Sequence, residues 1–215
     1  MTREEQKRLR DLEKSFALAC RSVGKRRGWK RIAGTYYQTR DGMLYEVCFA
    51  QAPAGAGKRE TVWLRGKPLA LDELFWEVFH MKEDAAKMPF SFHVNGEFTA
   101  HVLTLDCWDV ELLPEDLETS ADRLFAEAEE KVDAQSFPDI PAFREAAAKV
   151  RGQELNVVLC LLLEGRYQEA AQAIDGALAR HDSGGFVRCT DSGSVSAMED
   201  ARDWCAARLA ERIVT

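Results

Sequence analysis

The stretch that decides the fold is Trp29–Gln51, with the sequence WKRIAGTYYQTRDGMLYEVCFAQ. Its dipeptide Asp41-Gly42 tolerates the positive φ angles of a type I′ turn, the turn that closes two-residue β-hairpins. Aromatic and β-branched residues make up half of the flank from Trp29 to Arg40, and Tyr45, Val47 and Phe49 alternate in the flank from Met43 to Gln51. The sequence therefore predicts an antiparallel hairpin with one strand in each flank.

A two-residue loop also fixes the register of this hairpin, because it places Arg40 opposite Met43 and Tyr36 opposite Val47. Side chains alternate between the two faces of a strand. One face then collects Tyr36, Met43, Tyr45, Val47 and Phe49. The opposite face collects Thr35, Tyr37, Leu44, Glu46 and Cys48. The first set is the more apolar, so we expect it to face the core.

Outward from the hairpin, the N-terminal segment predicts an amphipathic helix, with cations in its last turns and Gly28 as its stop. Its apolar residues recur at helical spacing: Leu9, Leu12, Phe16, Ala19 and Val23. A third strand is expected at Glu60–Lys67 and a helix at Leu71–Phe79.

A second hairpin is expected around Asn95-Gly96, with strands at Phe90–Val94 and Glu97–Leu105. After Pro114 the periodicity is helical to the end, and Ser196 with Glu199 forms a capping-box pattern before the last helix. The other expected C-terminal helices cover Ala121–Ala134, Ile140–Val150, Leu155–Leu163 and Tyr167–Arg180.

This order of elements predicts an α+β fold, because the strands are grouped ahead of most of the helices. We expect the N-terminal helix to pack on an antiparallel sheet of about five strands, followed by an all-helical C-terminal half. The expected domains are an α+β sheet domain over residues 1–113 and a helical region over 114–215, packed on the sheet or forming a small second domain.

Composition favours a soluble protein of the cytoplasm. The charged N-terminus lacks the apolar core of a signal peptide, and the longest apolar run, Val157–Leu163, is too short to cross a membrane. None of the six cysteines forms a Cys-x-x-Cys pair, which is typical of buried thiols in a reducing compartment. The sequence gives no basis for an oligomeric state.

Charge is distributed unevenly along the chain. Residues 1–31 hold eleven Lys and Arg against four acidic residues, whereas Asp106–Asp139 holds twelve acidic residues against Arg123 and Lys131. The net charge of −7 argues against a nucleic-acid partner, despite the basic cluster from Lys25 to Arg31. An acidic surface is instead suited to a basic protein partner.

No motif in the chain specifies a reaction, and we predict no metal and no cofactor. In the expected second hairpin His93 and His101 point to opposite faces, so they cannot share an ion. The loop Gly55–Thr61 resembles a phosphate loop but has Arg59 where that motif needs a hydroxyl. Ser183–Gly185 and Asp191–Ser194 are interpreted as a mobile connection, since a nucleophile elbow is absent.

The N-terminal half resembles a family of uncharacterised bacterial proteins, domain-of-unknown-function family 4304. The resemblance rests on Gly28–Arg31, Gly34–Tyr37, Asp41-Gly42 and Val47–Gln51, and it extends at most over residues 9–113. Members begin with an amphipathic helix, a Gly-aromatic-Lys stretch and strands that end in Gln. Some small acidic domains of this kind occur beside toxin genes, so the resemblance implies an immunity-like role and no catalytic residues.

Two functional hypotheses remain open. The first is a non-catalytic protein-binding module that docks a basic partner, such as a nuclease toxin, through an acidic surface. Its expected contact residues are Asp106, Asp109, Glu111, Glu115, Asp116 and Glu118. The alternative is an enzyme or small-molecule binder with a pocket between sheet and helices. That pocket would be lined by Trp29, Tyr36, Tyr45, Trp63, Trp76 and Trp108.

Overall fold

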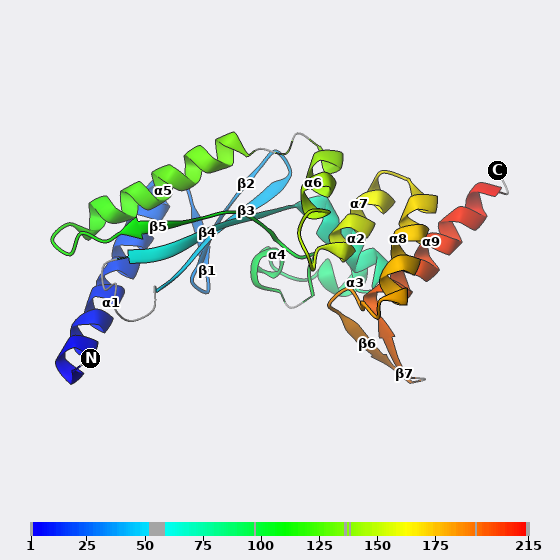
Figure 1. Cartoon of the computed structure of the whole chain (residues 1–215), viewed down its shortest axis with the longest axis horizontal. Helices are drawn as coiled ribbons and strands as arrows, with labels where there is room; N and C mark the ends of the chain where they lie inside the picture. Colours follow the sequence, from blue (N-terminus) through cyan, green and yellow to red (C-terminus); the bar gives the residue numbers. More distant parts are fainter. Residues whose placement is uncertain are drawn as a thin grey trace. The chain divides into compact units, whose positions relative to one another are not determined.

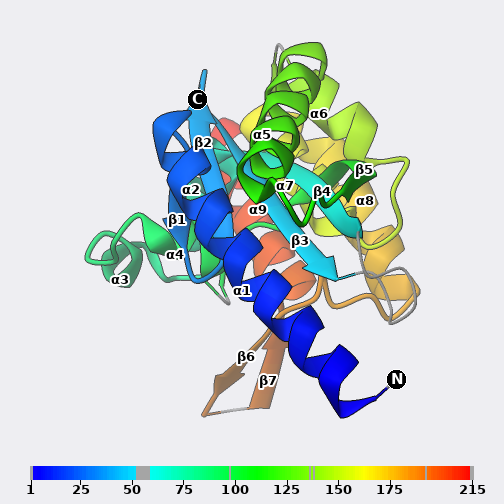
Figure 2. The ribbon, with the colours of Figure 1, turned by 90° about the vertical axis from the view of Figure 1, so that its left-hand side faces the viewer.

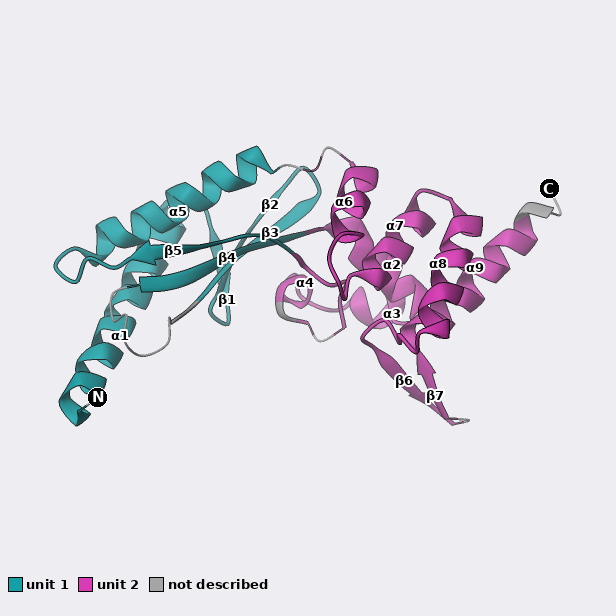
Figure 3. Ribbon diagram, viewed as in Figure 1, with its two compact units in different colours: residues 1–66, 104–136 teal, residues 67–103, 137–215 magenta. Residues whose placement is uncertain are grey.

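The structure, a computed structural model, describes residues 2–51, 59–96, 98–135, 137, 139–191 and 193–213. The chain forms two compact units, coloured separately in Figure 3. The first comprises residues 1–66 and 104–136, and the second comprises residues 67–103 and 137–215. The chain therefore leaves the first unit, enters the second, returns to the first and finally ends in the second.

This division differs from the expected boundary after residue 113. A fifth strand, β5 (Leu103–Glu111), and the helix α5 (Leu117–Ala134) belong almost wholly to the first unit. Three helices that precede them in sequence belong to the second unit, namely α2 (Leu69–Val78), α3 (Lys82–Ala85) and α4 (Ser91–Asn95). The expected domains followed the order of the elements along the chain. The contacts in the structure instead place α2, α3 and α4 in the second unit and α5 in the first.

The first unit is built on a five-stranded antiparallel sheet in the order β1-β2-β3-β4-β5, so each strand pairs with its neighbour in sequence (Figure 1). The first four strands are β1 (Lys30–Ile32), β2 (Thr35–Arg40), β3 (Met43–Gln51) and β4 (Arg59–Pro68). The connection between β3 and β4, where a phosphate-loop motif was rejected, falls mostly on residues 52–58, outside the described residues. The predicted third strand is confirmed as β4.

The predicted hairpin between β2 and β3 is confirmed in its register. Arg40 pairs with Met43 and Tyr36 with Val47. Asp41 and Gly42 adopt φ angles of 51° and 77°, as a type I′ turn requires. The single strand expected from Trp29 to Arg40 is wrong, because a tight turn at Ala33-Gly34 divides it into β1 and β2.

Two helices cross one face of this sheet, α1 (Arg3–Arg26) and α5, as Figure 2 shows. The ring of Tyr36 lies 5.0 Å from that of Phe125 on α5, and the ring of Phe16 on α1 lies 5.7 Å from that of Phe49. Gly24 permits the close approach, since a Cβ atom there would lie 2.9 Å from Phe125. Most of the expected core face is buried, namely Tyr36, Met43, Tyr45 and Val47.

Burial is not confined to that face. Tyr37, Leu44 and Glu46 belong to the opposite face of the β2–β3 hairpin, and all three are buried as well. Glu46 accepts a hydrogen bond from Arg65 on β4. The alternation of apolar and polar residues therefore identified one core face correctly but did not predict the burial of the other.

The second unit is mainly helical but contains a two-stranded sheet, so an all-helical C-terminal half is wrong. Its strands β6 (Val187–Thr190) and β7 (Gly193–Ser196) form an antiparallel hairpin where we expected a mobile connection. The remaining helices are α6 (Ile140–Ala147), α7 (Glu154–Leu163), α8 (Tyr167–Ala179) and α9 (Ala197–Ile213). The predicted capping box is confirmed, because Ser196 and Glu199 exchange hydrogen bonds at the start of α9.

The second predicted hairpin, around Asn95-Gly96, is wrong. The residues expected to form its first strand form α4, and Gly96 has an ordinary φ of −69°. Trp76 on α2 explains the difference, because its ring stacks on Phe92 and its Nε1 donates a hydrogen bond to the carbonyl of Phe98. These contacts hold the segment in the second unit, and they outweigh the local preference of the Asn-Gly pair.

A buried carboxyl group lies in the first unit. Glu60 on β4 is 4% exposed, and its Oε2 has no hydrogen-bond partner within the described part of the chain. Burial, together with the charge of Glu13 on α1, raises the pKa of Glu60 to about 7. The nearby thiol of Cys20 is also buried, and its pKa is raised to about 12.

The substitution Glu60→Gln should stabilise the protein at neutral and alkaline pH but not at acidic pH. The pKa of Glu60 is higher in the folded state, so its ionisation costs stability progressively as pH rises from about 4.5 through about 7. Glutamine removes that cost, which should raise the free energy of unfolding by up to about 3 kcal/mol at pH 8. Urea unfolding at pH 4 and pH 8 measures the difference. A gain of equal size at both pH values, or one shared by the exposed control Glu111→Gln, would contradict the assignment.

Candidate protein-binding site

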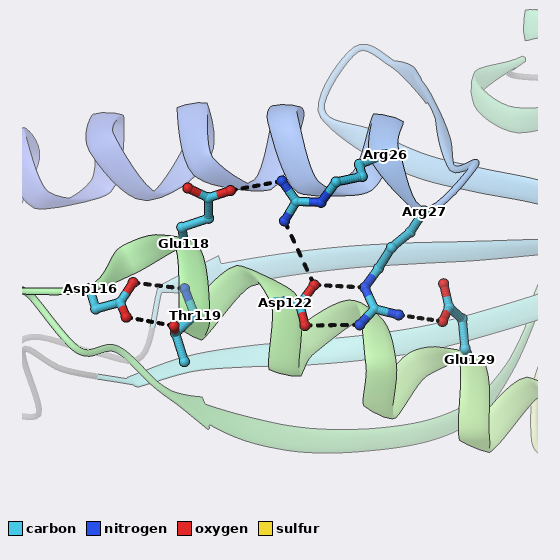
Figure 4. Close-up of polar contacts among 7 residues, drawn as sticks. All are labelled: Arg26, Arg27, Asp116, Glu118, Thr119, Asp122 and Glu129. Atoms are coloured by element: carbon cyan, nitrogen blue, oxygen red, sulfur yellow. Dashed lines mark hydrogen bonds and ion pairs between the residues drawn. The ribbon is translucent and has the colours of Figure 1, made fainter.

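The acidic helix α5 is held against the basic end of α1 by ion pairs (Figure 4). Arg27 donates from Nε and Nη2 to the two carboxylate oxygens of Asp122, each over 2.9 Å. Its Nη1 donates to Glu129 over 2.7 Å. One guanidinium therefore binds two acidic residues of α5, in the two-pronged geometry that makes arginine–carboxylate pairs strong.

Two neighbours extend this network. Arg26 donates to Glu118 over 2.7 Å and lies 3.9 Å from Asp122. Trp29 donates from its indole Nε1 to Glu129 over 3.2 Å. The hydrogen bond from Arg27 holds the pKa of Asp122 below its usual value, so this carboxylate stays charged across the neutral range.

Three of the six predicted contact residues are engaged within the first unit. Asp106 on β5 accepts a hydrogen bond from Lys131 over 2.7 Å, and this bond lowers the pKa of Asp106. Asp116 caps the N-terminus of α5 by accepting from the backbone of Thr119 over 3.0 Å. Glu118 is the partner of Arg26. These residues hold the fold together, a role that the charge pattern alone did not reveal.

The other three lie at the exposed end of β5 and in the connection to α5. Asp109 accepts a hydrogen bond from the hydroxyl of Thr61 over 2.9 Å. Glu111 and Glu115 are exposed. Within the described residues, none of the three forms an ion pair shorter than 4.0 Å. Their charges are therefore available to a partner.

Ion pairs within the protein do not neutralise all the acidic residues of the stretch Asp106–Asp139. The stretch Asp106–Asp139 contains twelve acidic residues and two cations of its own. Three arginines from elsewhere in the first unit contact it: Arg26, Arg27 and Arg40, the last paired with Asp133. Asp139 belongs to the second unit, so after all five cations are counted the part of the stretch in the first unit retains six negative charges.

The aromatic residues expected to line a pocket are mostly buried, and those that make ring contacts pack against their neighbours. Trp29, Tyr36 and Tyr45 are at most 3% exposed, and the rings of Trp29 and Tyr36 both pack on Phe125. Trp76 belongs to the second unit, apart from the other five. The ring contacts observed are those of a packed core.

The second unit contains a buried polar cluster that sequence reasoning missed. Lys67 and Asp72 are both fully buried, and Lys67 Nζ donates to Asp72 Oδ1 over 2.8 Å and to the carbonyl of Ala100 over 3.0 Å. The backbone N–H of Ala100 donates to the same carboxylate oxygen over 2.9 Å. His93 Nδ1 lies 2.8 Å from the other oxygen, Oδ2. The sequence signal for this cluster is the presence of a lysine and an aspartate inside the largely apolar stretch Lys67–Trp76.

This cluster connects the start of α2 with α4 and with the segment before β5. The ring of His93 lies between those of Trp76 and Phe90, at 4.8 Å from each. His101 lies elsewhere in the unit, with its ring 5.0 Å from Phe186. The described residues contain no group of three or more His, Cys, Asp or Glu side chains arranged to hold a metal ion.

Comparison with protein-family models, with curated proteins and with solved structures found no match for this chain. Among the described residues, no helix has both the length and the apolar character needed to cross a membrane.

The substitution Asp72→Asn should strongly destabilise the second unit. Asparagine keeps the shape but removes the charge that compensates Lys67, and leaving a buried cation unpaired costs about 3–5 kcal/mol. Urea unfolding, with the exposed Asp84→Asn as control, measures the loss. Adding Lys67→Met to Asp72→Asn should recover part of it. A free energy of unfolding for Asp72→Asn within about 0.5 kcal/mol of the wild type would contradict this role.

Proposed function

We propose that this protein is a non-catalytic protein-binding module whose acidic surface docks a basic partner protein. The contact surface is the exposed end of β5 and the connection to α5, with Asp109, Glu111 and Glu115 as its principal acidic residues. Asp106 and Glu118 position this surface because they join α5 to β5 and to α1, and Asp116 caps the start of α5.

The observation that carries the proposal is the charge left over after internal pairing. A region with six uncompensated negative charges attracts a cationic surface over distances up to the screening length, about 8–10 Å at physiological salt. Such fields accelerate encounter and orient the partner before contact. Proteins that bind basic partners through steering gain mainly in association rate.

The partner class follows from this surface. It should present lysines and arginines in a compact patch, as nucleases and other proteins that act on nucleic acids do. The immunity-like role implied by the resemblance to domain-of-unknown-function family 4304 is one instance of such binding, in which the partner is a toxin.

A test of the surface uses a fluorescent deca-arginine peptide as the probe and stopped-flow association as the measurement. The triple variant Asp109→Asn, Glu111→Gln, Glu115→Gln removes three negative charges from the proposed surface. The matched control Glu83→Gln, Asp84→Asn, Asp203→Asn removes three exposed charges from the second unit. The two variants therefore have the same net charge.

The proposal predicts that the surface variant lowers the association rate at least tenfold at low salt, whereas the control changes it less than about twofold. The wild-type rate should also fall steeply between low and physiological salt. Equal effects of the two triple variants, or an association rate insensitive to salt, would contradict a localised acidic docking surface.

A further inference from the structure

A groove in the second unit is built from the loop before α7, the first turn of α7, the end of α8 and the loop that follows α8. It consists of two adjoining hollows that share Glu154 and Arg180 as wall residues. The larger hollow has a volume of about 690 Å³ and the smaller of about 380 Å³. These volumes are in the range of small-molecule sites.

The larger hollow has two arginines in its lining, and the same lining includes two acidic residues, Glu154 and Asp182. Arg151 and Arg180 line it, together with His101. Across the described residues, neither arginine forms an ion pair shorter than 4.0 Å. This distinguishes them from Arg26, Arg27, Arg144 and Arg166, whose guanidiniums are each bound to carboxylates. Two free guanidiniums beside an imidazole are suited to a doubly charged anion.

The two acidic residues that line the same hollow are offset by their local surroundings. Asp182 accepts a hydrogen bond from the backbone N–H of Gly184 over 2.8 Å and so shapes the loop. Glu154 is the first residue of α7, where the positive end of the helix dipole compensates a carboxylate. Among the described residues, neither carboxylate pairs with Arg151 or Arg180 within 4.0 Å, so both guanidiniums can bind a ligand.

The loop that closes this hollow depends on glycine. Gly184 and Gly185 have φ angles of 75° and 83°, and a Cβ atom on Gly185 would lie 2.8 Å from His101 Cε1. Only glycine lets the backbone approach the imidazole at this distance without strain. The approach places His101 at the wall of the hollow.

The smaller hollow is largely apolar. Its walls include Ala147, Val150, Val157 and Ala173. The guanidinium of Arg180 folds back along α8, with Nη1 3.5 Å from the position that a Cβ atom on Gly176 would occupy. Arg180 therefore stands between an anionic-ligand site on one side and an apolar slot on the other.

We propose that this groove binds a phosphate monoester of a small apolar molecule. The phosphate is held by Arg151 and Arg180 beside His101, and the apolar part lies in the slot between α6, α7 and α8. A phosphate monoester carries close to two negative charges at neutral pH, which matches two guanidiniums better than a single carboxylate does. This site is independent of the acidic surface on the first unit.

Isothermal titration calorimetry of the full chain tests the proposal with phenyl phosphate, inorganic phosphate and phenol as probes. Phenyl phosphate should bind at least tenfold more tightly than either of the others. The variant Arg151→Gln, Arg180→Gln should weaken it at least tenfold. The control Lys87→Gln, Arg202→Gln removes two exposed cations from the same unit outside the groove and should leave the affinity unchanged.

The variant Ala173→Leu tests the apolar slot separately. It should weaken phenyl phosphate at least threefold and leave inorganic phosphate unchanged, because leucine fills the slot without touching the charges. Circular dichroism spectra and melting temperatures confirm that each variant is folded. Absence of saturable phenyl phosphate binding up to roughly 10 mM would overturn the site. So would equal losses in the arginine and control variants, or an Ala173→Leu variant that binds phenyl phosphate as the wild type does.

Discussion

The packing of α1 against α5 in the first unit depends on the ion pairs of the Arg27 guanidinium. Arg27 is the C-cap residue of α1, and its guanidinium binds Asp122 and Glu129 of α5. These two acidic residues lie about two turns apart on the same face of α5, and about a hundred residues after Arg27 in the chain. Beneath this guanidinium the rings of Trp29, Tyr36 and Phe125 are in contact. Charge complementarity between the two helices thus accompanies the apolar packing that covers the sheet.

The same network divides the acidic residues into two groups with different consequences. Asp122, Glu129 and Glu118 face arginines and contribute to the fold. Asp109, Glu111 and Glu115 have no such partner among the described residues and give the surface its negative field. In a stretch that looks uniformly acidic in sequence, some acidic residues therefore stabilise the fold and others remain exposed and unpaired with arginine. The acidic charge on which the proposed partner binding depends is what the arginines of α1 and β2 leave uncompensated.

Local chemistry could be predicted from the sequence, and contacts between distant residues could not. Asp41-Gly42 fixed a hairpin to the residue, because a two-residue turn leaves no freedom in register. Asn95-Gly96 carries the same signal, yet Trp76 draws that segment into a helix. The acidic stretch was visible, but its pairing with Arg26 and Arg27 was not, since nothing local indicates which helices meet. The buried Lys67–Asp72 pair is different, because its two residues are only five apart and their place in an apolar stretch was a local signal.

A double-mutant cycle between Arg27 and Asp122 tests most directly whether this pair holds α1 and α5 together. The free energy of unfolding is measured by urea for the wild type, Arg27→Met, Asp122→Ala and the double variant, at low and high salt. The account predicts a coupling of about 1 kcal/mol at low salt, reduced at high salt because both side chains remain partly in water. Additive effects of the two substitutions, within about 0.3 kcal/mol, would contradict it.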